Sequence, residues 1–180
     1  KNKTDMFIED LDTIPFPARD LINMDAYLKD QYARSHAMRL PRANVISSRG
    51  CPFNCIYCSI HSIWQHTYRT RGPKNVVDEI ALLVEKFRIR EIAFWDDNLT
   101  FHKERVLGIC DEIMRRKIDI SWCAPNGVAI MTLDKEMLAR MKKSGCYKLT
   151  FGIETGSPDT QRFIRKSYID LKRAKEIIGY

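Results

Sequence analysis

Residues 43–58 read Ala-Asn-Val-Ile-Ser-Ser-Arg-Gly-Cys-Pro-Phe-Asn-Cys-Ile-Tyr-Cys, a short strand candidate that runs directly into a loop with three cysteines. The strand candidate covers residues 43–47, and Cys51, Cys55 and Cys58 follow it at spacings of four and three residues. Three thiolates this close in the chain can wrap one compact metal centre. The sequence therefore predicts a metal centre at the carboxyl end of a strand.

Strand and helix patterns alternate after this loop. Strands are expected at 91–95, 119–124 and 147–153, and helices at 75–87, 106–114, 134–144 and from Ser157 to the end. Asn75 and Ser157 are the expected N-caps, and Gly145 is expected to end the third helix. About four strand–helix units predict an α/β fold with a parallel, curved sheet, which is too short to close an eight-strand barrel.

A polar segment follows each predicted strand. These segments are Ser48–Gly50, Asp96–Asn98, Pro125–Gly127 and Glu154–Gly156. Because the carboxyl ends of parallel strands meet at one edge of a sheet, we expect one functional site on that rim.

The composition is that of an ordinary globular domain. The 180 residues are 44% hydrophobic and 29% charged, with a net charge of +7. No apolar run reaches the roughly 20 residues of a membrane span, and no signal peptide is recognisable, so a cytoplasmic location is expected. Residues 1–40 differ in pattern and are interpreted as a linker or lead-in, with a short helix near 20–29. The domain proper is expected at 41–180.

Two classes of metal centre compete for the cysteine loop. A 4Fe–4S cluster normally takes four cysteines, and Cys110, Cys123 and Cys146 all lie in segments that favour packing roles. A three-cysteine cluster would leave one iron open for a ligand. The alternative is a Cys₃His zinc site completed by His61 or His66, and a ferredoxin-like electron carrier is a third interpretation. Spacing and placement favour the cluster over zinc.

The loop resembles the signature of the radical S-adenosylmethionine (SAM) superfamily, with Tyr57 just before the last cysteine. The likeness spans about residues 40–180. Segments 69–80, 94–98 and 152–157 make it most similar to the subgroup with an upstream cobalamin-binding domain, such as anaerobic porphyrin cyclases and hopanoid-pathway enzymes. The resemblance implies a partial (βα) barrel, because the superfamily core usually has six units. The chain is therefore expected to be the N-terminal part of that core within a longer enzyme.

The resemblance also implies roles for individual residues. Cys51, Cys55 and Cys58 would hold the 4Fe–4S cluster, and SAM would bind its open iron. The run Asp96, Asp97 and Asn98 takes the place of a family Gly-Gly-Glu run that contacts the SAM amine. Glu154 would bind the SAM ribose, and Tyr57 would lie near the adenine.

The implied activity is reductive cleavage of SAM to a 5′-deoxyadenosyl radical. In the intact protein this would serve cobalamin-dependent methyl transfer or ring remodelling of a small molecule, with an external one-electron donor. Cobalamin would bind an upstream domain outside this chain. The alternatives are a tRNA methylthiotransferase-like enzyme and a Cys₃His zinc module.

Much of the excess positive charge lies between residues 34 and 74. A solvated basic surface, an anionic substrate, the SAM carboxylate and RNA would each account for it. No motif of interleaved aromatic and basic residues stands out, so a nucleic-acid partner is not expected.

Overall fold

The computed structural model describes residues 6–29 and 36–180. The elements before the cysteine loop are η1 Leu11–Thr13, η2 Arg19–Leu21, α1 Met24–Leu28, β1 Arg42–Val45 and β2 Ser48–Arg49. Those after it are α3 Ile60–Trp64, β3 Arg69–Thr70, α4 Pro73–Phe87, β4 Glu91–Phe94, α5 Lys103–Arg115, β5 Ser121–Val128, η3 Ile130–Thr132, α6 Lys135–Lys143, β6 Cys146–Phe151, α7 Pro158–Phe163 and α8 Leu171–Ile178. Residues 1–5 and 30–35, which belong to the expected lead-in, lie outside the described ranges.

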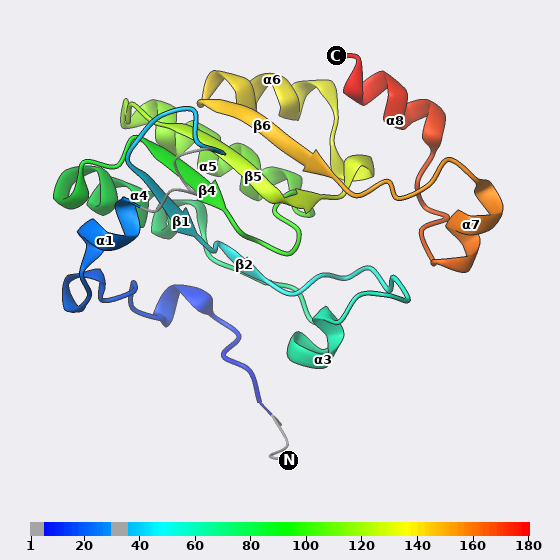
Figure 1. The fold of residues 1–180 in the computed structure, drawn as a ribbon, viewed down its shortest axis with the longest axis horizontal. Coiled ribbons are helices and arrows are strands. Elements are labelled where there is room, and N and C mark those ends of the chain that lie inside the picture. The colour runs from blue at the N-terminus through cyan, green and yellow to red at the C-terminus, as the bar shows by residue number, and fades with distance from the viewer. Residues whose placement is uncertain (1–5, 30–35) are drawn as a thin grey trace.

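A four-stranded sheet in the order β1-β4-β5-β6 forms the centre of the fold, and every neighbouring pair in it is parallel. Figure 1 shows α4, α5 and α6 together on one side of this sheet, with α7 and α8 beyond the end of β6. The predicted α/β fold with four βα units is confirmed. In this order each strand lies next to the strand that precedes it in the sheet, as successive βαβ crossovers place them.

The core lies between the sheet and its helices. Val76, Ile80 and Leu83 recur at helical spacing on α4 and are completely buried. All four residues of β4 are buried, as is usual for a central strand of a parallel sheet. Phe94 meets Trp122 of β5 edge to face, with ring centroids 5.4 Å apart. The carboxyl ends of the strands are therefore supported by a closely packed core.

Several local features differ from the expectations. The antiparallel pair β2–β3 and the one-turn helix α3 were not expected, because two-residue strands and a five-residue helix carry no readable periodicity. The N-cap of α4 is Gly72, and Pro73 occupies the first turn. The Asn75 expectation was wrong: its side chain accepts a hydrogen bond from Arg71 Nε at 2.7 Å. β5 also runs on through 125–127 to Val128.

The N-terminal segment lies along the free edge of β1. Asp12 accepts a hydrogen bond from Gly72 N at 2.8 Å, and Arg19 Nη2 donates to Asn44 O at 3.2 Å. The helix expected near 20–29 is α1, capped by the Asn23 side chain. In the described part of the chain, no helix combines the length and the apolar character needed to cross a bilayer.

Gly145 makes the tight turn between α6 and β6. Its φ is +105°, and a Cβ there would stand 2.3 Å from the carbonyl oxygen of Ile120. Gly156 offers the matched comparison, because a Cβ there would meet nothing within 4 Å. Only the first of these glycines is required by the fold.

We expect Gly145→Ala to lower the free energy of unfolding by about 1–3 kcal/mol or more, through backbone strain and the clash with Ile120 O. Gly156→Ala should change it by no more than about 0.5 kcal/mol. Urea unfolding followed by circular dichroism measures both. Equal losses in the two variants would contradict the assignment of the turn.

Candidate functional site

One cavity of about 180 Å³ lies at the carboxyl ends of the strands. Its lining includes all three cysteines of the loop together with four other residues that the sequence singled out: Cys51, Cys55, Cys58, Tyr57, Asp97, Asn98 and Glu154. Asn126 from β5 completes the contribution of the strand ends. Parallel strands therefore bring to one rim groups that are about 100 residues apart in sequence.

Gly50 directs the chain from β2 into the cysteine loop. Its φ is +89°, and a Cβ would stand 2.1 Å from Thr67 O, so the two backbones approach each other here as only glycine allows. Gly50 N donates to Asp97 Oδ2 at 3.0 Å. The loop thus begins at a position tied to the end of β4.

Asp96 lies behind the rim and does not line the cavity. Its side chain is 1% exposed, and its carboxylate accepts hydrogen bonds from Ser47 N and from the hydroxyls of Ser47 and Ser48. Arg105 Nη2 donates to Ser47 O at 2.7 Å, so the guanidinium is buried beside this carboxylate. Burial raises the pKa of Asp96, and Arg105 and the serines oppose that shift. We call these four residues the Asp96 network.

Glu154 lies at the opposite wall of the cavity and is engaged through one oxygen. Its Oε1 accepts from Tyr57 Oη at 3.0 Å and from Lys166 Nζ at 2.9 Å. Lys166 also donates to Gly152 O at 2.6 Å and lies over the Tyr57 ring. Lys166 lowers the pKa of Glu154, which keeps the carboxylate ionised and accepting at neutral pH.

Lys166 is a charged site residue that sequence reasoning missed. It lies twelve residues beyond Glu154, within a basic stretch that carries no motif. Its side chain is only 8% exposed and is paired with Glu154. Lysine is almost never buried unless it has such a partner. The burial of Lys166 marks it as part of the site, and the sequence alone does not reveal that burial.

Aromatic side chains shield the inner part of the cysteine loop. Phe53 stacks on Tyr168 with ring centroids 4.3 Å apart and meets Phe101 edge to face at 6.0 Å. Burial raises the pKa of the Cys51 thiol. Cys58 lies exposed on the outer side of the loop. The Cys51 thiol is therefore partly shielded from solvent, whereas the Cys58 thiol is exposed to it.

The residues present fit a cluster better than a single ion. Within residues 6–29 and 36–180, no three His, Cys, Asp or Glu side chains stand close enough to hold one metal ion. Each cysteine of a cubane binds its own iron, so the ligands of a cluster need not converge on one atom. Asn98 Nδ2 is a buried donor beside the Cys51 thiol, with no nitrogen or oxygen acceptor among the described residues, and its side chain lines the same cavity. A carboxylate or a metal-bound sulfur there would satisfy it.

One of the two candidates for the fourth ligand of a zinc site, His61, is engaged by the backbone. His61 Nε2 lies 2.6 Å from Phe53 O and Nδ1 lies 2.9 Å from Gln65 O. Both ring nitrogens are thus occupied by backbone carbonyls. Of the remaining cysteines, Cys110 and Cys123 are buried in the core, and burial raises the pKa of the Cys110 thiol to about 11. These two have the packing roles expected of them.

Comparison with known proteins adds independent findings. The model of the radical SAM superfamily matches residues 45–180. An uncharacterized methyltransferase of Pyrococcus horikoshii is 36% identical over 88% of this chain and 32% of its own length. Cytidylyl-2-hydroxyethylphosphonate methyltransferase of Streptomyces wedmorensis is 31% identical over 95% of this chain and 32% of its own. The chain thus spans about a third of the length of these relatives.

The subgroup predicted from the sequence also appears among the relatives. The anaerobic magnesium-protoporphyrin IX monomethyl ester cyclase of Rubrivivax gelatinosus is 29% identical over 83% of this chain and 26% of its own length. The fold is shared with the radical SAM methyltransferase TsrM of Kitasatospora setae, solved with cobalamin and a [4Fe-4S] cluster bound. The TM-score is 0.68 at 16% identity, over 76% of this chain and 28% of that one.

Asp96 and Asp97 should differ in how much stability is lost when the carboxylate is removed. We expect Asp96→Ala to lower the free energy of unfolding by about 3–5 kcal/mol, because Arg105 is left buried without its counter-charge. Asp97→Ala should cost about 1 kcal/mol, since it gives up one hydrogen bond at the rim. Urea unfolding measures both, and a similar loss in the two variants would rule out the structural role of Asp96.

Proposed function

Because the chain belongs to the radical SAM superfamily, we propose that Cys51, Cys55 and Cys58 bind a 4Fe–4S cluster and that the polar groups around them bind SAM. The observation that carries this proposal is the shared cavity, in which three thiols lie together with Asp97, Asn98 and Glu154. Three ligands in place of four leave one iron for the amino and carboxylate groups of SAM.

A reduced cluster held by Cys51, Cys55 and Cys58 would supply the one electron for cleavage of SAM to methionine and a 5′-deoxyadenosyl radical, and that radical would take a hydrogen atom from the substrate. The chain's own residues orient the reactants and exclude water. Phe53 and Tyr168 cover the inner side of the cysteine loop. Asp97 and Asn98 offer a carboxylate and an amide donor at the end of β4, which suit the amine and the carboxylate of SAM respectively. Asp96 acts as a positioning residue behind them.

Glu154 is assigned to the ribose of SAM. Its Oε1 is held by Tyr57 and Lys166, whereas Oε2 has no partner within the described part of the chain. An ionised carboxylate with one oxygen anchored and the other free is suited to accept a hydrogen bond from a ribose hydroxyl. Tyr57, fixed by the same bond, would flank the adenine.

In the intact protein we assign this chemistry to cobalamin-dependent methyl transfer or ring remodelling of a small molecule, with an external one-electron donor. Relatives named as methyltransferases and a cyclase support this assignment. Residues 41–180 would be the N-terminal part of the core, with cobalamin on an upstream domain that residues 1–40 connect to it. The cytoplasm, where thiols stay reduced, is the location proposed for it.

Cluster binding is tested by anaerobic reconstitution of the chain with iron and sulfide. We expect about four iron atoms and four sulfides per chain and, after reduction, an EPR signal that shifts when SAM is added. Cys55→Ala should lose the cluster, and the matched variant Cys110→Ala should retain it, because Cys110 lies in the core of α5. One tightly bound zinc and no iron would refute the proposal.

The role of Glu154 is tested by the affinity of the cluster-loaded chain for SAM. We expect Glu154→Gln to weaken SAM binding by about tenfold or more, through loss of a charge-assisted hydrogen bond. Glu176→Gln, on the exposed side of α8, is the control and should bind as the parent does. Equilibrium dialysis of labelled SAM gives the affinities, and an unchanged value in Glu154→Gln would remove the residue from the site.

A further inference from the structure

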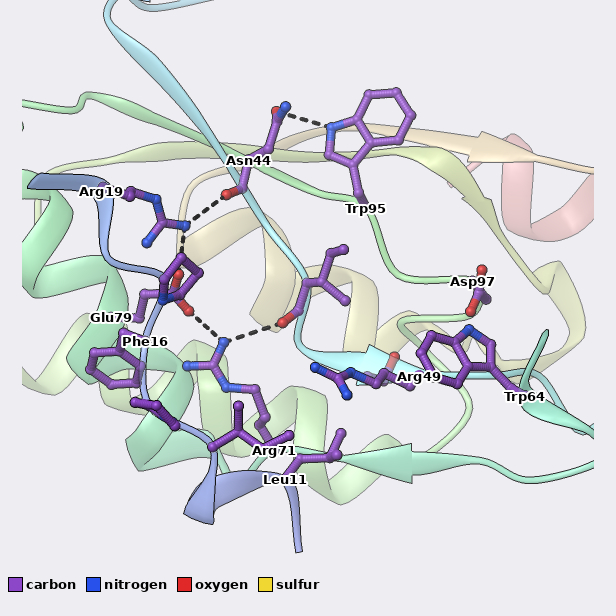
Figure 2. A pocket seen from close by; sticks show the side chains of 15 residues that line it. Leu11, Phe16, Arg19, Asn44, Arg49, Trp64, Arg71, Glu79, Trp95 and Asp97 are labelled. Atoms are coloured by element: carbon purple, nitrogen blue, oxygen red, sulfur yellow. Dashed lines mark hydrogen bonds and ion pairs between the residues drawn. The ribbon is translucent and has the colours of Figure 1, made fainter. Parts of the chain in front are cut away.

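A second and larger cavity opens beside the cysteine loop. It encloses about 680 Å³ between the N-terminal segment, from Leu11 to Arg19, and the strands β1 and β2. Figure 2 shows Arg19, Glu79 and Arg71 on one side of this cavity and Arg49, Trp64 and Asp97 on the other. The volume lies within the roughly 300–1,000 Å³ typical of small-molecule sites. None of the roles assigned so far uses it.

The far wall of the cavity is structural. Glu79, whose side chain is 1% exposed, pairs with Arg19 at 2.6 Å and also with Arg71. Arg19 and Arg71 further donate to Asn44 O and Ile46 O, each at 3.2 Å. These two guanidinium groups are therefore engaged by Glu79 and by the edge of β1, and of their nitrogens only Arg19 Nη1 is buried without a hydrogen-bond partner in the described ranges. They hold the N-terminal segment in place as a wall.

Arg49 is different, because its guanidinium has no hydrogen bond or ion pair with any residue in the described ranges. Its one contact of note is with the face of the Trp64 ring, 5.5 Å from the centroid. The side chain is partly buried in a cavity that Phe16, Ile46 and Trp95 also line. A guanidinium presents five donors, and a partly buried one gains more from an anion than an exposed one does.

The charges around the cavity favour an anion. Three guanidinium groups line it against two carboxylates, and Glu79 is already shared by two of the three. The second carboxylate, Asp97, accepts from Gly50 N and is not paired with Arg49. The positive charge of Arg49 therefore remains uncompensated. The aromatic rings beside it would cover an apolar body attached to the anion.

Asp97 connects this cavity to the proposed cofactor site. It lines both cavities and lies three residues beyond the end of β4. A ligand in the larger cavity would thus lie one side chain away from groups assigned to SAM. This adjacency is what a substrate of a reaction initiated at the rim requires.

The geometry points to the larger cavity as the substrate site, with Arg49 binding a phosphate, phosphonate or carboxylate carried on an aromatic or apolar body. This inference rests on the proposed function, which supplies the reaction at the neighbouring site. The inference also gives one arginine of the basic stretch between residues 34 and 74, Arg49, a specific role in binding an anion.

Binding is measured by quenching of tryptophan fluorescence, because Trp64 and Trp95 line the cavity and Trp122 lies in the core. The probes are 4-nitrophenyl phosphate, 4-nitrobenzoate and the neutral 4-nitrobenzyl alcohol. We expect both anions to quench saturably, at least about tenfold more tightly than the alcohol. The relative affinities of the two anions distinguish a phosphate-type from a carboxylate-type substrate.

Arg49→Gln should abolish the preference for the anions, and Arg49→Lys should retain part of it. Arg90→Gln is the matched control, because Arg90 is exposed and precedes β4 at the opposite end of the strand. Unfolding midpoints of all variants verify that they fold. Equal binding of anion and alcohol by the parent chain, or an anion preference that persists in Arg49→Gln, would overturn the inference.

The same sample separates this inference from the proposed function. Iron content and the SAM-dependent EPR shift report the proposed function without reference to the larger cavity. A chain that loads the cluster and binds SAM but shows no anion preference contradicts the substrate site alone. A chain that prefers anions through Arg49 but takes up no cluster supports the binding site and contradicts the proposed function.

Discussion

The buried carboxylate of Asp96 is the constraint on which the rim of the sheet depends. A carboxylate removed from water has to be satisfied by neighbouring donors, and here they come from Ser47, which lies between β1 and β2, and from Ser48 of β2. Arg105 of α5 fixes Ser47 in turn. The ends of two strands and one helix are thus locked together. Gly50 lies two residues after Ser48, and the cysteine loop begins directly after it.

The neighbouring aspartate has a different role, because the chain bends at Asp97 after the end of β4. Asp96 faces the core, whereas Asp97 faces the rim and lines both cavities. A run of three polar residues at a strand end therefore divides into an anchor and two groups available to ligands. The same short segment therefore stabilises the fold through Asp96 and lines the cavity through Asp97 and Asn98.

Much of the architecture could be predicted, because the apolar spacing on α4, α5 and α6 and the short apolar run of β4 directly reflect burial. Most of the site could be predicted as well, since strand ends converge: Asp97, Asn98 and Glu154 meet the three cysteines in one cavity. The inward turn of Asp96, the burial of Lys166 and the pairing of β2 with β3 depend on contacts between distant segments. No local pattern records such contacts, and residues 11–19 likewise gave no sign that they form a cavity wall.

The arginines at the free edge of β1 also affect how this sheet associates. An unpaired strand edge is a template for pairing with other chains, and proteins protect such edges with charged groups. Here Asn44 O and Ile46 O already accept from Arg19 and Arg71, so an incoming strand would find those acceptors taken. The opposite edge, at β6, has no such cover in the described ranges. The two edges of the sheet therefore differ, because arginines occupy backbone acceptors only at the β1 edge among the described residues.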